Sequence, residues 1–148
     1  MKYYIAGPMS GIAQFNYPAF FDAAEQLRNA GYDVVSPAEM DSPEVQAAAL
    51  ASEEGNLSEL ADTGESWGDM LSADVKLIAD DVDGVLVLPG WEKSRGARLE
   101  AFVAVCVQKP VSTINSGLIV DIPNFIVMKE IHTNVLNQGD VSRYEETA

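Results

Sequence analysis

The amino-acid sequence predicts a single α/β domain built on a doubly wound sheet. Short β-rich stretches alternate with amphipathic helical patterns along most of the 148 residues. The stretch GVLVL at residues 84–88 is continuously apolar, which is typical of a parallel strand covered on both faces. Because strands alternate with helices, we expect about five mostly parallel strands with helices on both faces, a flavodoxin/Rossmann-like arrangement over residues 1–148.

The first part of the chain predicts two strands and the helix between them. The β-rich stretch KYYIA forms the first strand at residues 2–6, and DVVSP at residues 33–37 forms the second. Apolar residues recur at helical spacing from Tyr17 to Asn29, and Gly31 follows as a stop signal. The apolar stripe of this helix consists of Phe20, Ala23, Ala24 and Leu27.

The second part predicts three helices and two further strands. They are a helix from Trp67 to about Asp80, a strand at 84–88, a helix that contains Glu100, a strand at 110–114 and a last helix between Asn124 and Asn137. The apolar positions of the first of these helices are Met70, Leu71, Val75 and Ile78. Cys106 lies among valines in the Glu100 helix, so we expect it to be a small buried core residue.

An acidic insertion separates these two parts. From Glu39 to Ser66 the chain carries eight acidic residues and no basic ones. Residues from about 40 to 66 therefore form either a helix with a mobile flap over the site or a solvated segment without direct chemistry. The solvated segment is the more common explanation, because most runs of like charges are exposed to solvent.

The charge and composition exclude several classes of protein. A formal net charge of −14 repels polyanions, so we expect no nucleic-acid polymer as a partner. No apolar run approaches the roughly 20 residues that span a bilayer, so we expect no membrane partner. The N-terminal MKYYIAGPMSG is typical of a strand and its loop rather than of a signal peptide. One cysteine fits a reducing cytoplasm, which is the expected location.

Three loops follow predicted strands, and ligands of such sheets bind beyond the carboxyl ends of strands. The first loop, GPMSG, is permissive enough for its backbone amides to approach an anion, although it matches neither the Rossmann nor the P-loop pattern. It consists of Gly7, Pro8, Met9, Ser10 and Gly11. The second loop follows VVSP. The third, GWEKSRG, brings Lys93 and Arg95 close to Arg98, which indicates either a small-anion site or a basic solvated loop.

Two acidic residues are candidates for chemistry. Glu100 shares a helical stripe with the apolar Val103, Ala104 and Val107, and no cation lies four residues later to pair with it. It is either a carboxyl at the rim of a cavity or a stabilising charge near a helix start. Asp74 is either a site residue or an ordinary solvated helix aspartate. The local pattern leaves these alternatives open.

We expect no metal and no cofactor. His132 is the only histidine and Cys106 the only cysteine, so the sequence offers no cluster of zinc ligands. A Ser-His-Asp mechanism would have to use His132, and no G-x-S-x-G pattern supports it.

Three stretches carry a resemblance to a known family. They are YYIAGPMSG, SADVKLIADDVDGVLVL and SRGARLEAFVAVCVQKPV. They resemble the nucleoside 2-deoxyribosyltransferase family, which includes relatives that hydrolyse 2′-deoxynucleoside 5′-monophosphates at the N-glycosidic bond. The N-terminal pattern is similar to small uncharacterised members often carried by bacteriophages, which would act in the host cytoplasm. The resemblance covers roughly Lys2 to Ile114, interrupted by the acidic insertion.

This resemblance implies roles for the matching residues. Glu100 matches the family nucleophile, which attacks the anomeric carbon and forms a glycosyl-enzyme intermediate. Asp74 matches the aspartate that holds the base, and it would protonate the base as it leaves. Tyr4 matches a tyrosine that orients the nucleophile. The backbone of Gly7 to Gly11 would line the sugar or phosphate pocket.

Position 94 favours one branch of the family. Transferases of unphosphorylated nucleosides tend to have an acid six residues before the nucleophile, whereas the monophosphate hydrolases have serine. Here Ser94 is followed by Arg95 and Gly96 and preceded by Lys93. A hydroxyl and cations would hold a 5′-phosphate that a carboxylate would repel. The resemblance therefore implies N-glycosidic cleavage of a (2′-deoxy)nucleoside 5′-monophosphate, with water as the acceptor and free base and sugar phosphate as products.

Some positions depart from the family pattern. The hydrolases have a basic residue in the first loop, where this chain has Ser10, and the run 96–99 lacks the usual aromatic residue. In the family, a neighbouring subunit often supplies a polar residue about 25 positions after the glutamate. Asn124 falls near that position, which implies a homodimer or higher homo-oligomer.

Three functions follow from these features. They are a nucleotide N-glycosidase, a deoxyribosyltransferase of unphosphorylated nucleosides, and a nucleotide-binding or sensing module without turnover. Glu100 and Asp74 at the family spacing favour an enzyme, whereas the changed first loop favours the binding module. The fold alone does not separate them.

Overall fold

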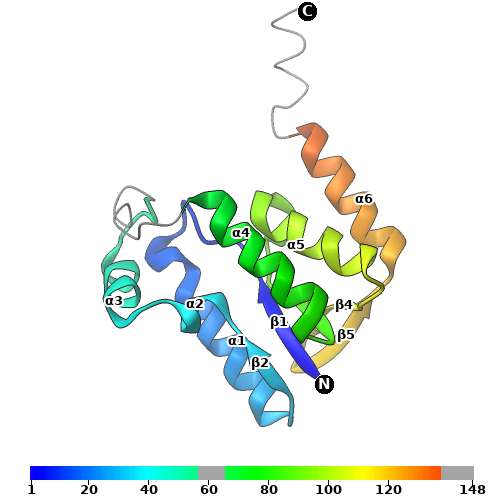
Figure 1. The fold of residues 1–148 in the computed structure, drawn as a ribbon, viewed down its shortest axis with the longest axis horizontal. Coiled ribbons are helices and arrows are strands. Elements are labelled where there is room, and N and C mark those ends of the chain that lie inside the picture. Colours follow the sequence, from blue (N-terminus) through cyan, green and yellow to red (C-terminus); the bar gives the residue numbers. More distant parts are fainter. Residues whose placement is uncertain (57–65, 138–148) are drawn as a thin grey trace, which may run out of the picture.

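The structure, a computed structural model, describes residues 1–56 and 66–137 and has a five-stranded sheet at its centre (Figure 1). The strands lie in the order β2-β1-β3-β4-β5. Their bounds are β1 Lys2–Ala6, β2 Asp33–Val35, β3 Gly84–Val87, β4 Val111–Asn115 and β5 Leu118–Ile122. Strands β1 to β4 are parallel, and β5 is antiparallel to β4. The doubly wound α/β prediction is confirmed, and the strand order changes direction between β1 and β3, where such sheets bind ligands.

Helices cover both faces of this sheet. Their bounds are α1 Tyr17–Asn29, α2 Pro37–Met40, α3 Pro43–Ala51, α4 Trp67–Lys76, α5 Arg95–Cys106 and α6 Asn124–Val135. A single π-helical turn, Leu77–Asp81, continues α4, and α6 packs beside α5 (Figure 1). None of the helices in the described part of the chain is long and apolar enough to cross a bilayer.

Strand β1 divides its side chains between two cores because successive residues of a strand point to opposite faces. Tyr3 and Ile5 pack with Phe20 and other residues of α1 on one face. Tyr4 packs with Ala101 and other residues of α5 on the opposite face. Tyr4 is therefore the tyrosine of β1 that faces the helix of Glu100.

Most of the predicted elements are confirmed by the structure. The helix Tyr17–Asn29 has the predicted bounds, its whole predicted stripe is buried, and Gly31 follows with a φ of 92°. The strands expected at 2–6, 84–88 and 110–114 are present with shifts of at most one residue at an end. The last helix ends at Val135 rather than Asn137.

Three details differ from the sequence-based expectations. Cys106 is exposed rather than buried, because α5 turns its alanines toward the sheet. Met70 is 41% exposed, although it was expected on an apolar stripe. Strand β5, which no predicted stretch covered, follows a two-residue turn at Ser116 and Gly117 with φ of 51° and 79°. Positive φ at both positions defines the type I′ hairpin that joins antiparallel strands.

The described part of the acidic insertion packs against the loop after β1. The Gly11 N–H donates to the Gly55 carbonyl at 2.9 Å, and the Gln14 N–H donates to the Ser52 carbonyl at 2.8 Å. A Cβ atom on Gly55 would lie 2.2 Å from the Ile12 carbonyl oxygen. The insertion therefore belongs to the folded body up to this point, and the expected flap falls partly on residues 57–65, outside the described residues.

Replacing Gly55 by alanine is expected to lower the free energy of unfolding by about 1–3 kcal/mol, since it adds a backbone clash at a strained φ. The φ of Gly55 is +68°, a conformation that alanine adopts poorly. Urea unfolding measures the effect. The control is Gly68→Ala in α4, whose Cβ would meet only the Ser66 hydroxyl at 3.8 Å. Equal stability of the two variants would contradict the close packing at Gly55.

Candidate active site

Three predicted site residues converge from three separate elements. Tyr4 of β1 is fully buried, Glu100 of α5 is 7% exposed, and Asp74 of α4 is partly buried. Both carboxyl groups interact with the Tyr4 hydroxyl, which affects the pKa of each, and the charge of Asp74 also raises the pKa of Glu100. These residues lie far apart in the sequence, but the fold brings them together. Helix α4 precedes β3, α5 follows it, and both helices lie on the same face of β1.

Small side chains on α5 explain how a glutamate comes so close to β1. Ala97, Ala101 and Ala104 are each at most 1% exposed and pack against the sheet. Glu100 lies on this same buried side of the helix. Alanines let the helix axis approach the strands, so the longer Glu100 side chain is carried below the surface and withdrawn from water.

The Tyr4 hydroxyl is the shared contact of the two carboxyl groups. It interacts with both of them, but within the described residues it makes no hydrogen bond of ordinary length and angle. Hydrogen bonds of catalytic groups are often long or poorly aligned before a substrate binds, and they tighten in the complex.

Burial raises the pKa of both carboxyl groups. The pKa of Glu100 rises to about 8 through burial, with a further rise from the charge of Asp74 and a partial opposing effect of the Tyr4 hydroxyl. The pKa of Asp74 rises to about 6 through burial, the Tyr4 hydroxyl opposes this, and the charge of Asp41 adds to it. Because the two groups are coupled, the pair retains a proton near neutral pH.

The structure adds two residues that the sequence did not single out as site residues. The Tyr17 hydroxyl, at the first position of α1, donates a hydrogen bond to Asp41 Oδ2. Asp41 follows α2 directly and is partly buried. It belongs to the segment after VVSP, one of the three loops where we expected a ligand, and this position was the only sequence signal for it.

The first loop follows β1, at the point where the strand order changes direction. Some of its backbone groups already form hydrogen bonds within the protein. A Cβ atom on Gly7 would lie 2.9 Å from the Leu88 side chain, so the loops after β1 and β3 touch. The Pro8 carbonyl accepts from Asn16 Nδ2 at 3.0 Å. The Gly11 amide is already bonded to Gly55 and is not available to an anion. Met9 is partly buried and Ser10 is exposed.

The third loop leads into the N-terminus of α5. Ser94 is the N-cap of this helix, and its hydroxyl accepts from the Ala97 N–H at 3.2 Å. Arg98 is 7% exposed and donates from Nη1 to the Glu92 carbonyl at 3.1 Å. Arg95 is exposed at the first position of the helix, and Gly96 follows it.

Asn124 lies on a fourth element, α6, which packs beside α5. It begins α6 directly after β5, whose Ile122 pairs with Val111 at the start of β4. That register places Asn124 at the end of the sheet where the parallel strands begin. Tyr4 of the cluster lies midway along β1, where it pairs with Val85 of β3.

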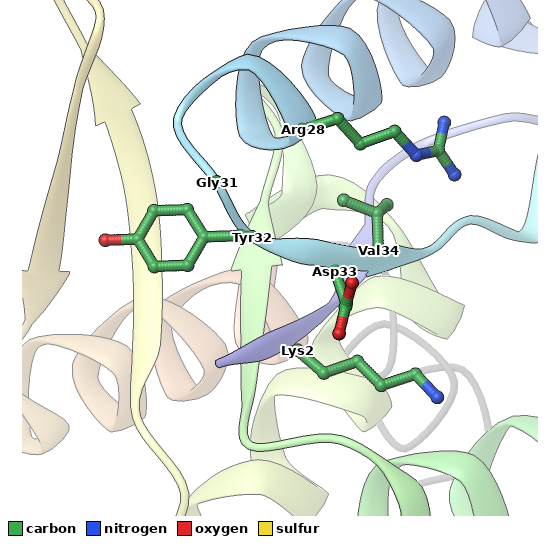
Figure 2. A pocket seen from close by; sticks show the side chains of 6 residues that line it. All are labelled: Lys2, Arg28, Gly31, Tyr32, Asp33 and Val34. Carbon is green, nitrogen blue, oxygen red and sulfur yellow. The ribbon is translucent and has the colours of Figure 1, made fainter.

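A surface hollow at the edge where β1 and β2 begin is distinct from the cluster (Figure 2). It is lined by Lys2, Arg28, Gly31, Tyr32, Asp33 and Val34. The Arg28 guanidinium is paired with the Glu39 carboxylate through contacts of 2.9 and 2.7 Å. This hollow contains no buried titratable pair, so we place the candidate site at the Tyr4 cluster.

The family assignment comes from a comparison with family models. A model described as a domain of unknown function, DUF4406, matches residues 1–113, about three quarters of the chain. The chain belongs to the DUF4406 family. Tyr4, Asp74 and Glu100 all lie inside the DUF4406 match, whereas Asn124 lies beyond it. No curated protein and no solved structure matches the chain. Within the described residues, no three His, Cys, Asp or Glu side chains are arranged to hold a metal ion.

The raised pKa of Glu100 predicts a stability that falls as the pH rises. Its pKa is 4.5 in an unfolded chain and about 8 in the folded one, so the folded state keeps a proton that the unfolded state releases. The stabilisation is complete below the unfolded pKa and is lost as the pH rises through the folded pKa. At about 1.4 kcal/mol for each pKa unit, the loss amounts to a few kcal/mol.

Thermal unfolding between about pH 5 and pH 9 measures this loss. The variant Glu100→Gln is expected to lose much less stability over this range than the wild type, with a smaller slope left from Asp74. Glu25→Gln, which alters an exposed glutamate of α1, should follow the wild type. A pH dependence of Glu100→Gln equal to that of the wild type would contradict the buried, protonated Glu100.

Proposed function

We propose that this protein cleaves the N-glycosidic bond of a (2′-deoxy)nucleoside 5′-monophosphate and releases free base and sugar phosphate. The observation that carries the proposal is the convergence of Glu100, Asp74 and Tyr4 in a buried place at the strand crossover. These are the residues that match the catalytic positions of the nucleoside 2-deoxyribosyltransferase family, to which we propose that the DUF4406 chain is related.

In the first step, a Glu100 carboxylate oxygen attacks the anomeric carbon of the sugar. The bond between this carbon and the base nitrogen breaks, and its electron pair stays with the base. Asp74 transfers its proton to the departing base, and the sugar phosphate remains on Glu100 as an ester. The Tyr4 hydroxyl orients the Glu100 carboxylate by donating a hydrogen bond to it.

In the second step, water replaces the base. The Asp74 carboxylate accepts one proton of the water, the oxygen attacks the anomeric carbon, and the bond to Glu100 breaks. Glu100 is released as a carboxylate and Asp74 is protonated again. The net reaction consumes one water molecule for each base released, so both carboxyl groups return to their starting state.

The protonation states of the pair set a condition on this mechanism. The higher pKa belongs to Glu100, at about 8, and the lower to Asp74, at about 6, so the shared proton rests mainly on Glu100 before a substrate binds. Catalysis needs the reverse arrangement. The positive charge that develops on the sugar favours an ionised Glu100, and a basic ring nitrogen favours a protonated Asp74, so substrate binding supplies the driving force for this exchange.

The N-terminus of α5 supports the choice of a phosphorylated substrate. Ser94 caps this helix and Arg95 opens it, with Lys93 directly before them. A helix N-terminus favours an anion, and a serine hydroxyl can donate to a phosphate oxygen. The transferase alternative, which acts on unphosphorylated nucleosides with a second base in place of water, lacks the acidic residue expected at position 94.

One observation favours a binding or sensing module instead. A glutamate with a pKa of about 8 is mostly protonated at neutral pH, and a protonated carboxyl is not a nucleophile. A nucleotide bound beside it without turnover would use the same loops. The two functions differ in whether the base is released.

We further propose that the protein acts in the cytoplasm as a homodimer or higher homo-oligomer. Asn124 begins α6 at the end of the sheet where the parallel strands start, and in the family that the chain resembles a polar residue near this position often completes the site of a neighbouring copy. Phe125 beside it is 72% exposed and Leu118 of β5 is 69% exposed, and such exposed apolar side chains are common in interfaces.

Base release tests the proposed function directly. Purified protein is incubated with each ribo- and deoxyribonucleoside 5′-monophosphate, and free base is separated by chromatography. We expect release that falls on the order of 10⁴-fold or more in Glu100→Gln and on the order of 10²-fold or more in Asp74→Asn. Glu25→Gln should release base at the wild-type rate. Saturable binding of a nucleotide without any release would favour the sensing module and overturn the glycosidase.

A further inference from the structure

Helix α4, which carries Asp74, has little core packing of its own. Among residues 68–76 of this helix none is fully buried, and Met70 is 41% exposed. The fully buried side chain that follows is Ile78, which is 0% exposed and lies in the π-helical turn after α4. The position of Asp74 above the sheet therefore depends on how this end of α4 is held.

The π-helical turn leaves two backbone carbonyls for another partner. The Val82 N–H donates five residues back, at 3.2 Å, and the Asp83 N–H donates to β1, at 2.8 Å. In a continuing α-helix these two N–H groups would bond to the carbonyls of Ile78 and Ala79. Instead, Lys109 Nζ donates to both carbonyls, each at 2.8 Å. A cation at this end of a helix is also favoured by the helix dipole.

The main chain of Lys109 is fixed to α5 and to the sheet. Its N–H donates to the Ala104 carbonyl at 2.9 Å, and the chain turns at Gln108 with a left-handed φ of 61°. The carbonyl of the next residue, Pro110, accepts from the Val85 N–H of β3 at 2.9 Å. Because the backbone is bonded on both sides, the partly buried Lys109 side chain starts from a defined point and reaches from α5 to the end of α4.

The two helices that Lys109 connects each carry one acid of the pair. Asp74 precedes Ile78 by four residues, and Glu100 precedes Ala104 by four residues. Residues four apart lie on the same face of a helix, about one turn from each other. Ile78 and Ala104 belong to one buried cluster, and α4 is in contact with α5 (Figure 1). Lys109 therefore joins the two helices about one turn beyond each carboxyl group.

We propose that Lys109 is a positioning residue of the reaction, which connects the end of α4 to the end of α5 and so fixes the separation of the Asp74 and Glu100 carboxyl groups. This inference rests on the proposed N-glycosidase function. Lys109 does not touch the reacting atoms in this scheme. A lysine that only caps a helix end bonds to that helix alone, whereas Lys109 is bonded to both helices.

Both steps of the proposed reaction require a constant separation of the two acids. Glu100 attacks the anomeric carbon while Asp74 protonates the base that leaves it, and Asp74 later activates the water that releases the sugar from Glu100. In retaining glycosidases, two carboxyl groups with these roles stand about 5–5.5 Å apart. A misplacement of about 1 Å can lower the rate by roughly 100-fold.

The variant Lys109→Met tests this role, because it removes the ammonium and keeps a long unbranched side chain. The first measurement is steady-state base release from the nucleoside 5′-monophosphate that the wild type cleaves. We expect kcat to fall roughly tenfold or more, with KM changed by less than about threefold. The Ser94 end of α5, where we propose that the phosphate binds, is the opposite end of that helix, so substrate binding should change little.

The second measurement does not depend on turnover. It is the titration of the Glu100 carboxyl carbon by NMR in ¹³C-labelled protein. If α4 moves away from α5, Glu100 becomes more accessible to water and lies farther from Asp74. Its pKa of about 8 should then fall by roughly half a unit or more. A lysine that contributes only to stability would leave this titration unchanged in the folded protein.

Three further variants complete the design. Lys76→Met removes a cation from the last turn of α4 that pairs with Asp80 at 3.0 Å within the same helical segment, so both measurements should keep their wild-type values. Lys109→Arg keeps a cation with several N–H donors and should restore most of kcat. If Lys109→Met does not fold, Lys109→Gln replaces it, because its shorter side chain keeps an N–H donor; the same changes are expected at a smaller size.

The outcomes separate this inference from the proposed function. An unchanged Glu100 titration in the folded variant, or a wild-type kcat in a protein that releases base, overturns the positioning role. A shifted titration in a protein whose wild type releases no base supports the connection through Lys109 and overturns the glycosidase alone. A shifted titration together with a fall in kcat that Lys109→Arg restores supports both.

Discussion

The withdrawal of the Glu100 carboxyl from water is the constraint on which the candidate site depends. A buried carboxyl must either keep its proton or find partners, because an unpaired charge in an apolar surrounding is costly. The alanines of α5 create the burial, and Tyr4 and Asp74 supply the partners. The sheet topology brings these partners together, since β1 lies beside β3 and both neighbouring helices pack on one face. A change in any of these elements would alter the proton held by the pair.

The acidic insertion contributes more to this arrangement than a solvated charge run would. Its beginning supplies Asp41, which accepts a hydrogen bond from the buried Tyr17 hydroxyl, and the segment after α3 is bonded to the loop after β1. The net charge of −14 is therefore not spread only over the surface, because part of it is concentrated at the carboxyl edge of the sheet. A concentration of acids at one place favours the retention of protons there, which is what acid catalysis near neutral pH requires.

Local patterns in the sequence predict the elements well where one signal dominates. The helix at Tyr17–Asn29 has a clear apolar stripe and a glycine stop, and both of its bounds are confirmed. Cys106 was placed wrongly because α5 is apolar on more than one side, and the sequence does not show that its alanines face the sheet. Strand β5 was missed because its hairpin depends on left-handed backbone at Ser116, where a serine gives little warning.

The candidate site was predictable only in part. Tyr4, Asp74 and Glu100 came from the family resemblance, since each has an ordinary structural explanation when its neighbours are considered alone. Asp41 lies 33 residues before Asp74, and no periodicity connects the two, so their coupling appears only when the chain is folded. Tyr17 looked like a plain helix residue for the same reason.

The measurement that tests the central claim most directly is a mass spectrum of the protein after incubation with a 2′-fluorinated nucleoside 5′-monophosphate. The fluorine slows hydrolysis of a glycosyl-enzyme ester, so the account predicts a sugar-phosphate adduct on the peptide that contains Glu100. The adduct should be absent from Glu100→Gln. An adduct on a different residue, or a protein that releases base and stays unmodified under these conditions, would contradict Glu100 as the nucleophile.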